Sequence, residues 1–216
     1  VGWVGKPFAD RLLFGFTYSN MYKEIQTGVR QEAVFGEKHR KGHSLMPSLE
    51  YHKRDLFTKG LDVSLTANYN YNLTQNIDTV PYQYNWYGEK QYTGSKGEQS
   101  YQDNESKNKN WNGTFKVDYR LSRTQTFTLS HVLTVFERSN RSDVNSTSAV
   151  SDFTVPKKTR KNITGLSYRL MPAERWNFSA FGKYYNQHSS GLVSQNADGI
   201  GTVSYTHLTL PTSDLV

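Results

Sequence analysis

Hydrophobic and polar residues alternate along residues 61–72, which read LDVSLTANYNYN. Leucine, valine, alanine and tyrosine occupy the odd positions, whereas aspartate, serine, threonine and asparagine occupy the even ones. A period of two is typical of a β-strand with one apolar and one polar face. The apolar face therefore has to be covered, either by the core of a soluble sandwich or by lipid.

The same alternation recurs along the chain and predicts about seven strands in all. The others span 11–19, 44–52, 111–121, 127–135, 164–170 and 176–185. We expect each to have roughly 9–11 residues, the length with which a tilted strand crosses a bilayer. His131 falls among the apolar positions of its strand. Either it is buried against a neighbouring strand, or the register slips at this point.

The connections between these strands alternate in length. Short polar turns follow Tyr51, Leu121 and Leu170, and long polar loops are predicted over 20–43, 73–110 and 137–161. Loops in compact soluble domains are mostly short, whereas outer-membrane barrels combine short periplasmic turns with long extracellular loops. The predicted fold is therefore all-β, an antiparallel transmembrane β-barrel fragment of about seven strands in which residues 61–71 run outward.

Aromatic residues on the apolar parity gather near both ends of the predicted strands. Beside the long loops lie Tyr18, Tyr69, Tyr71, Trp111 and Tyr184; beside the short turns lie Tyr51, Tyr119, Phe127, Tyr168 and Trp176. Two aromatic girdles around an aliphatic band are typical of the two headgroup regions. The alternative is that aromatic residues simply form strands well. We favour the girdles, and hence lipid against the apolar face and a lumen beside the polar one.

Composition removes several classes of protein. The hydrophobic fraction is 35%, which is low for a packed soluble core, and no apolar run approaches the roughly 20 residues of a membrane-spanning helix. The absence of cysteine excludes disulfides and thiolate metal sites. The net charge of +7 includes basic clusters at 37–43 and 156–161. We interpret these as solvated loop charge, so no nucleic-acid partner is expected.

The sequence contains none of the enzyme motifs that were sought: a glycine-rich phosphate loop, HExxH or a nucleophile elbow. No enzymatic activity and no cofactor are therefore predicted. His39, His43 and His52 could suggest a metal, but we interpret them as polar histidines in a loop and at a lumen-facing strand position rather than as ligands.

The strongest functional signal is an aromatic cluster within the predicted loop at 80–92. Its candidate ligand-binding residues are Tyr82, Tyr84, Trp86, Tyr87 and Tyr92. Rigid amphipathic rings of this kind stack well on sugars, siderophore aromatics or peptides. The alternative is that they pack against one another over the barrel mouth, and the sequence does not decide between the two.

Three segments carry a resemblance to a known family. Residues 9–29 (ADRLLFGFTYSNMYKEIQTGV), 47–79 and 159–187 resemble the central barrel of TonB-dependent outer-membrane receptors, and the likeness extends roughly over 9–202. The family implies a barrel of about 22 strands closed by an N-terminal plug, larger than channel-forming porins. Residues 1–202 show no plug, no motif that docks the energy-coupling protein and no closing strand, so we expect an internal part of such a barrel.

The resemblance implies active uptake of a large nutrient ligand (siderophore, glycan or peptide) in the outer membrane of a Gram-negative cell. The implied partners are the lipid bilayer and a TonB-type energy-coupling protein acting through the plug, and a surface lipoprotein is a further candidate. Two alternatives stay open. One is an outer-membrane barrel without coupled transport, such as a porin or an adhesin; the other is a secreted β-sandwich that binds glycans.

The last segment, residues 203–216 (VSYTHLTLPTSDLV), resembles the translation of a transposase-type sequencing adapter. We therefore expect a non-native tail and exclude it from the fold prediction. The alternative is a last alternating strand.

We predict that residues 203–216 are absent from the natural protein. Mass spectrometry of the protein isolated from its host tests this, because a single peptide containing THLTLPTSDLV would contradict it.

Overall fold

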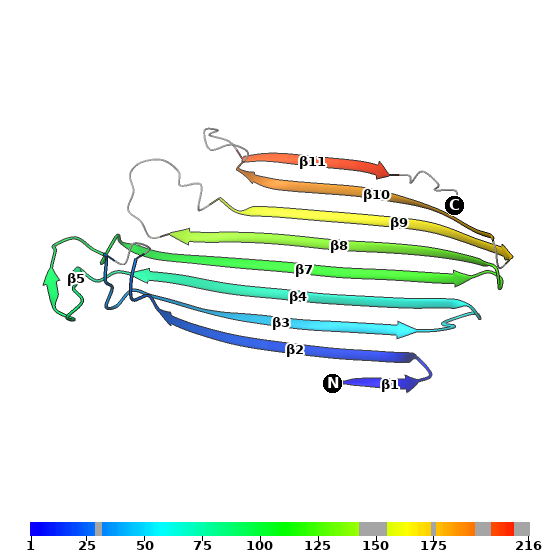
Figure 1. Cartoon of the computed structure of the whole chain (residues 1–216), viewed down its shortest axis with the longest axis horizontal. Helices are drawn as coiled ribbons and strands as arrows, with labels where there is room; N and C mark the ends of the chain where they lie inside the picture. Colours follow the sequence, from blue (N-terminus) through cyan, green and yellow to red (C-terminus); the bar gives the residue numbers. More distant parts are fainter. Residues whose placement is uncertain (29–31, 143–154, 174–175, 193–199, 210–216) are drawn as a thin grey trace.

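The computed structural model describes residues 1–28, 32–142, 155–173, 176–192 and 200–209. They form one antiparallel sheet of nine strands in the order β1-β2-β3-β4-β7-β8-β9-β10-β11, with a separate two-stranded sheet, β5-β6 (Figure 1). The strands are β1 (Gly2–Lys6), β2 (Ala9–Glu24), β3 (His39–Lys53), β4 (Leu61–Asp78), β5 (Tyr82–Tyr84), β6 (Lys90–Tyr92), β7 (Gln102–Arg120), β8 (Gln125–Ser142), β9 (Lys157–Ala173), β10 (Trp176–Leu192) and β11 (Ile200–Thr209). The chain is thus all-β over its described residues.

The seven predicted strands are confirmed as β2, β3, β4, β7, β8, β9 and β10, but their predicted length is wrong. β4 has 18 residues and β7 has 19, and the two pair without a break from Leu61↔Tyr119 to Asp78↔Gln102. The outer part of this pairing is mostly polar, with Leu73 and Ile77 as its apolar residues. Alternation of apolar residues shows only where a strand has an apolar face. Backbone pairing continues for as long as the two strands form hydrogen bonds with each other.

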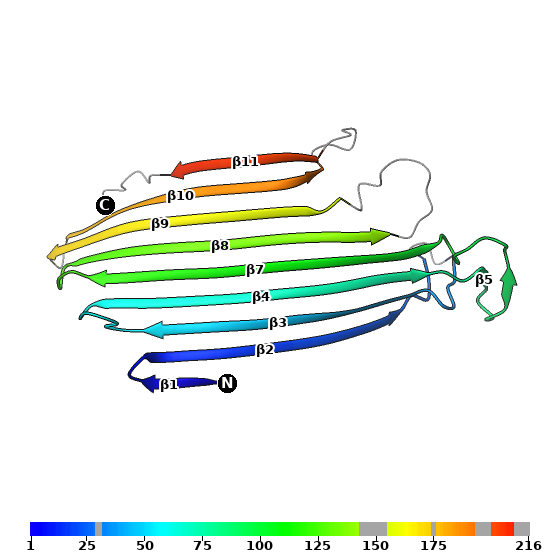
Figure 2. The ribbon, with the colours of Figure 1, turned by 180° about the vertical axis from the view of Figure 1, so that it is seen from behind.

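The predicted long loops are correspondingly too long. The connections begin and end at 25–38, 79–101 and 143–156, because the flanking polar residues belong to strands. Their alternation with short connections is confirmed: residues 7–8, 54–60 and 121–124 join strands at the opposite end of the sheet. Figures 1 and 2 show β5 and the described parts of the connections 25–38 and 79–101 together at one end.

Neither face of the sheet is covered by another layer within the described residues (Figures 1 and 2). The buried hydrophobic residues there are only Ala9, Phe35 and Val63. Many large apolar side chains are correspondingly exposed, including Phe16 at 68% and Leu166 at 58%. In the part of the chain that is described, no helix is long and apolar enough to cross a membrane.

Strand register sorts the side chains into the two predicted faces. Leu65 of β4 lies opposite Tyr51 of β3 and Phe115 of β7, so residues of apolar parity share one side. His131 lies on that same side, opposite Phe115 and Thr164. Its Nδ1 is 2.9 Å from Thr164 Oγ1, and the β8 register is continuous. No slip occurs there, and the imidazole is half-buried against its neighbouring strand.

Aromatic residues on the apolar face gather in two oblique bands across the sheet, with Phe14, Phe16 and Phe115 between the bands. Tyr51 and Tyr184 fall on one row of cross-strand partners, which passes through Leu65. Toward the short turns, the lower band continues from Tyr51 to Tyr119, Phe127, Tyr168 and Phe178; toward the long loops, the upper band runs from Tyr18 and Tyr71 through Tyr69 and Trp111 to Tyr184. Phe178 ends the lower band where Trp176 was predicted, and the side chain of Trp176 lies outside the described part. Ring contacts link neighbouring strands in both bands: Tyr69–Trp111 centroids are 4.4 Å apart and Phe127–Tyr168 centroids 4.7 Å.

The segment 203–216 lies partly within a strand. Residues 200–209 form β11, which pairs with β10 from Leu192↔Ile200 to Lys183↔Thr209; residues 210–216 lie outside the described part. Pairing of this kind is open to any alternating segment, so the non-native origin of the tail stays a prediction.

Gly60 offers a test of the tight turn between β3 and β4. Its φ is +88°, and an added Cβ would lie 2.6 Å from the Arg120 backbone oxygen. We expect Gly60→Ala to lower the free energy of unfolding by about 2–3 kcal/mol, from left-handed strain plus a backbone clash. Urea unfolding of the natural protein measures it.

Gly88→Ala is the matched control, since Gly88 has a φ of +78° but no atom within 4 Å of the added Cβ. Strain alone should cost about 1 kcal/mol. Equal losses for the two variants would contradict the clash at Gly60.

Candidate functional site at the long-loop end

The connections 25–38 and 79–101 fold against each other beyond the end of the sheet. Short bridges join Thr27 to Val34 and Val34 to Tyr84. The Ile25 amide donates to the Lys38 carbonyl at 2.9 Å, which holds the two ends of the first connection together. Contacts between the connections come mainly from two buried carboxylates.

Asp78 ends β4 and is the first of these carboxylates. It is 1% exposed. Its Oδ1 accepts the backbone N–H of Glu98, and its Oδ2 accepts that of Gln99 at 3.3 Å. Gly97 has a φ of +90°, and a Cβ there would lie 2.4 Å from Ser100 carbonyl carbon. Only glycine fits this turn without strain, and the turn presents both amides to Asp78.

Glu98 is the second buried carboxylate, at 4% exposure. Its two oxygens accept the backbone N–H groups of Gly36 and Glu37, each at 2.6 Å. A carboxylate that receives two backbone N–H groups of another segment fixes the relative position of both. Glu98 therefore ties the second connection to the first.

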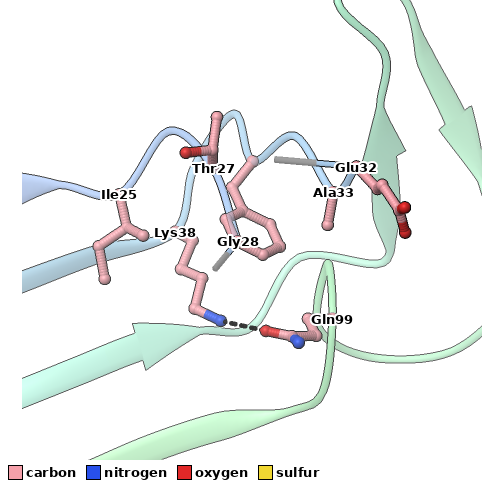
Figure 3. A pocket seen from close by; sticks show the side chains of 8 residues that line it. Ile25, Thr27, Gly28, Glu32, Ala33, Lys38 and Gln99 are labelled. Carbon is pink, nitrogen blue, oxygen red and sulfur yellow. Dashed lines mark hydrogen bonds between the residues drawn. The ribbon is translucent and has the colours of Figure 1, made fainter. Parts of the chain in front are cut away.

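Lys38 balances the charge of Asp78. Its Nζ lies 3.3 Å from Asp78 Oδ2. The same Nζ donates to Gln99 Oε1 at 3.0 Å (Figure 3). It also lies 4.4 Å from the centre of the Phe35 ring. A buried carboxylate without such a partner would be costly, so Lys38 is part of the fold here and not a free binding cation.

Tyr84 of the connection 79–101 contacts the connection 25–38. Its OH donates to Glu37 Oε1 at 2.9 Å, and its ring occupies the space that a side chain at Gly36 would fill, 2.7 Å from the added Cβ. Desolvation raises the pKa of the Tyr84 phenol above 10.0, and its hydrogen bond to Glu37 adds to the effect.

A hollow of about 470 Å³ lies beside this network. It is lined by Ile25, Thr27, Gly28, Glu32, Ala33, Phe35, Lys38 and Gln99 (Figure 3). Its size falls within the usual range for small-ligand pockets. The buried carboxylates beside it are engaged by backbone N–H groups, and Asp78 also by Lys38.

The hairpin β5-β6 carries the predicted aromatic cluster. Tyr82 lies opposite Tyr92 with ring centroids 5.8 Å apart, and Lys90 Nζ is 5.0 Å from the centre of the Tyr82 ring. Trp86 and Tyr87 stand at the tip, 67% and 91% exposed. The hairpin therefore offers exposed rings for a ligand.

Among the five predicted residues, Tyr82 and Tyr92 form one pair and Tyr84 packs on the first connection, while Trp86 and Tyr87 lie apart from both. Their role in ligand binding stays a prediction. The position predicted for His39 and His43 was wrong, because both lie in β3 and not in a loop. In the described ranges, no group of three or more histidine or acidic residues could hold a metal ion.

Sequence reasoning missed Lys38, Asp78 and Glu98. Each is a single charged residue in a polar region, and nothing in the local pattern distinguishes it from solvated neighbours. No protein-family model, curated protein or solved structure matches the chain.

Asp78→Asn tests the network. The amide NH₂ would face backbone N–H donors that now meet a carboxylate, and Lys38 would lose its ion pair. We expect a loss of about 3 kcal/mol or more of local stability. Hydrogen exchange of the amides of Gly36, Glu37, Glu98 and Gln99 should accelerate by about 100-fold for that loss.

Glu105→Gln is the control, because the Glu105–Lys107 pair is close, at 2.7 Å, but only half-buried. Such pairs contribute about 0–1 kcal/mol. Similar exchange in both variants would contradict the role given to Asp78.

Proposed function

We propose that the chain is part of the wall of an outer-membrane β-barrel of the TonB-dependent receptor type. The observation that carries the proposal is the pair of oblique aromatic bands on the uncovered apolar face. Three further features support it: strand length, the segregation of long connections to one end, and the near absence of a buried core in the described residues.

The slope of the bands matches the tilt of barrel strands. From Tyr51 on β3 to Phe178 on β10, the lower band crosses five strand spacings, about 24 Å, and descends six residues, about 20 Å. The upper band crosses six spacings, about 29 Å, from Tyr18 to Tyr184 with the same descent. The slopes are about 40° and 35°, against a barrel tilt of about 35–45°.

The separation of the bands suits a membrane. On β7, Trp111 and Tyr119 are eight residues apart, which is about 27 Å along the strand and about 21 Å along the membrane normal at a 40° tilt. The apolar band of outer-membrane barrels is about 25 Å tall. Girdle residues placed by strand propensity alone would not be expected to follow the tilt.

The polar outer part of the strands fits the same orientation. Past Trp111, β7 continues toward the long connections, and Lys109 and Lys107 there stand on the same side of the sheet as Trp111. Lys107 pairs with Glu105 at 2.7 Å. Strands that leave the bilayer carry polar residues on both faces. The hollow beside the connections would then lie outside the cell, where a nutrient ligand arrives. So would the aromatic hairpin β5-β6.

Coupled uptake is the part of the proposal that rests on the resemblance at 9–29, 47–79 and 159–187. It implies the outer-membrane bilayer as surroundings, an energy-coupling protein acting through a plug, and a siderophore, glycan or peptide as cargo. A porin or adhesin barrel would share the bands, and a plug domain in the parent reading frame separates these alternatives. A soluble sandwich is less well supported, because it needs a second sheet over the apolar face.

Leu65 and Thr66 test the membrane assignment. They are neighbours on β4 with side chains on opposite faces. In native membranes, Leu65→Cys should react about tenfold or more faster with a lipid-phase thiol reagent than with a water-soluble one. Thr66→Cys should show the reverse preference.

Leu65→Lys should cost about 2–4 kcal/mol at the midplane, against about 0–1 kcal/mol for Tyr69→Lys at the girdle. If the two cysteines label alike, or if their preferences are reversed, the membrane assignment fails.

A further inference from the structure

The polar face carries a second hollow over strands β7 to β10, distant from the long connections 25–38 and 79–101. Its volume is about 650 Å³. On the polar face its charged and hydroxyl-bearing lining residues are Lys116, Asp118, Thr126, Thr128, Ser130, Ser167, Arg169, Ser179 and Lys183, and the ring of Phe181 lies among them. All of them share the parity of Thr66 and therefore face away from the aromatic bands. We call this hollow the polar trough.

Small residues make the floor of the polar trough. One row of cross-strand partners reads Lys116, Ser130, Gly165 and Lys183 from β7 to β10. Gly165 is buried, and a Cβ there would lie 2.7 Å from Ser130 Oγ and 3.8 Å from Lys183 Cγ. The backbones of Lys116 and Lys183 are thus three strand spacings, or about 14 Å, apart. Only Ser130 and Gly165 lie between them in this row.

Cations outnumber carboxylates around this floor. Asp118 is already engaged, by Lys116 Nζ at 2.7 Å and by the Thr128 hydroxyl at 2.6 Å. Arg169 and Lys183 are exposed and have no ion-pair partner among the described residues. The nearby Arg120 is paired with Asp62 at 3.1 Å and adds no net charge. Two uncompensated positive charges therefore face a floor of hydroxyl groups.

We propose that the polar trough binds a small solute that carries two or more carboxylate or phosphate groups. Lys183 and Arg169 supply charge-assisted hydrogen bonds, and the Ser167 hydroxyl supplies a neutral one. The volume accommodates a solute with anionic groups at both ends. The site depends only on the polar face and stands whether or not the apolar face meets lipid.

Titration calorimetry of the natural protein in detergent at low salt tests the proposal. The probes are inorganic pyrophosphate for phosphate and tricarballylate for carboxylate, with myo-inositol as a neutral probe of similar size. We expect saturable binding of at least one anion, none of inositol, and weakening at high salt. Lys183→Gln and Arg169→Gln should each weaken binding by about tenfold.

Lys161→Gln is the matched control, because Lys161 lies on the same face of β9, four residues from Gly165 and outside the trough. It should bind the anions as the natural protein does. Binding of neither anion, equal binding of inositol, or an equal loss in the Lys161 variant would overturn the proposal. Failure of the cysteine-labelling test would leave these results unaffected, so the two proposals fail separately.

Discussion

Backbone pairing between neighbouring strands is the interaction on which the whole structure depends. A single sheet has no opposing layer, so its strands are held by ladder hydrogen bonds and by cross-strand side-chain pairs, each contributing about 0.2–1 kcal/mol. Register is decisive in such a sheet, because a slip of one residue would exchange the two faces. The unbroken pairing of β4 with β7 and of β7 with β8 keeps both aromatic bands and the polar trough in place.

At the long-loop end, side-chain hydrogen bonds replace backbone pairing. Connections outside the sheet have no ladder to hold them, and two buried carboxylates take over that role by accepting backbone N–H groups from opposite segments. Lys38 neutralises Asp78, whereas Glu98 is held by two backbone N–H groups. This network gives the exposed hairpin rings a firm base, and a ligand that binds to preordered loops does not bear the entropic cost of ordering them.

Residue size, as well as polarity, shapes the two faces. On the polar face, Gly165 and the serines leave a hollow where neighbouring rows carry larger groups. On the apolar face, His131 is accommodated because Thr164 on the adjacent strand provides a hydrogen-bond partner. In both cases the cross-strand neighbour, not the residue alone, decides what the position can do.

The sequence by itself determined seven of the strands (β2 to β4 and β7 to β10), their faces and the alternation of long and short connections, because a period of two is a local property that the chain carries without partners. It did not predict β1, β5 or β6, which are too short to show that period. It could not determine where β4 and β7 end: polar segments pair only because the opposite strand is there to receive their hydrogen bonds. Nor could it assemble Lys38, Asp78 and Glu98, or Lys116 with Arg169 and Lys183, since each set comes from separate segments. Those sites exist only once register has brought the strands and connections side by side.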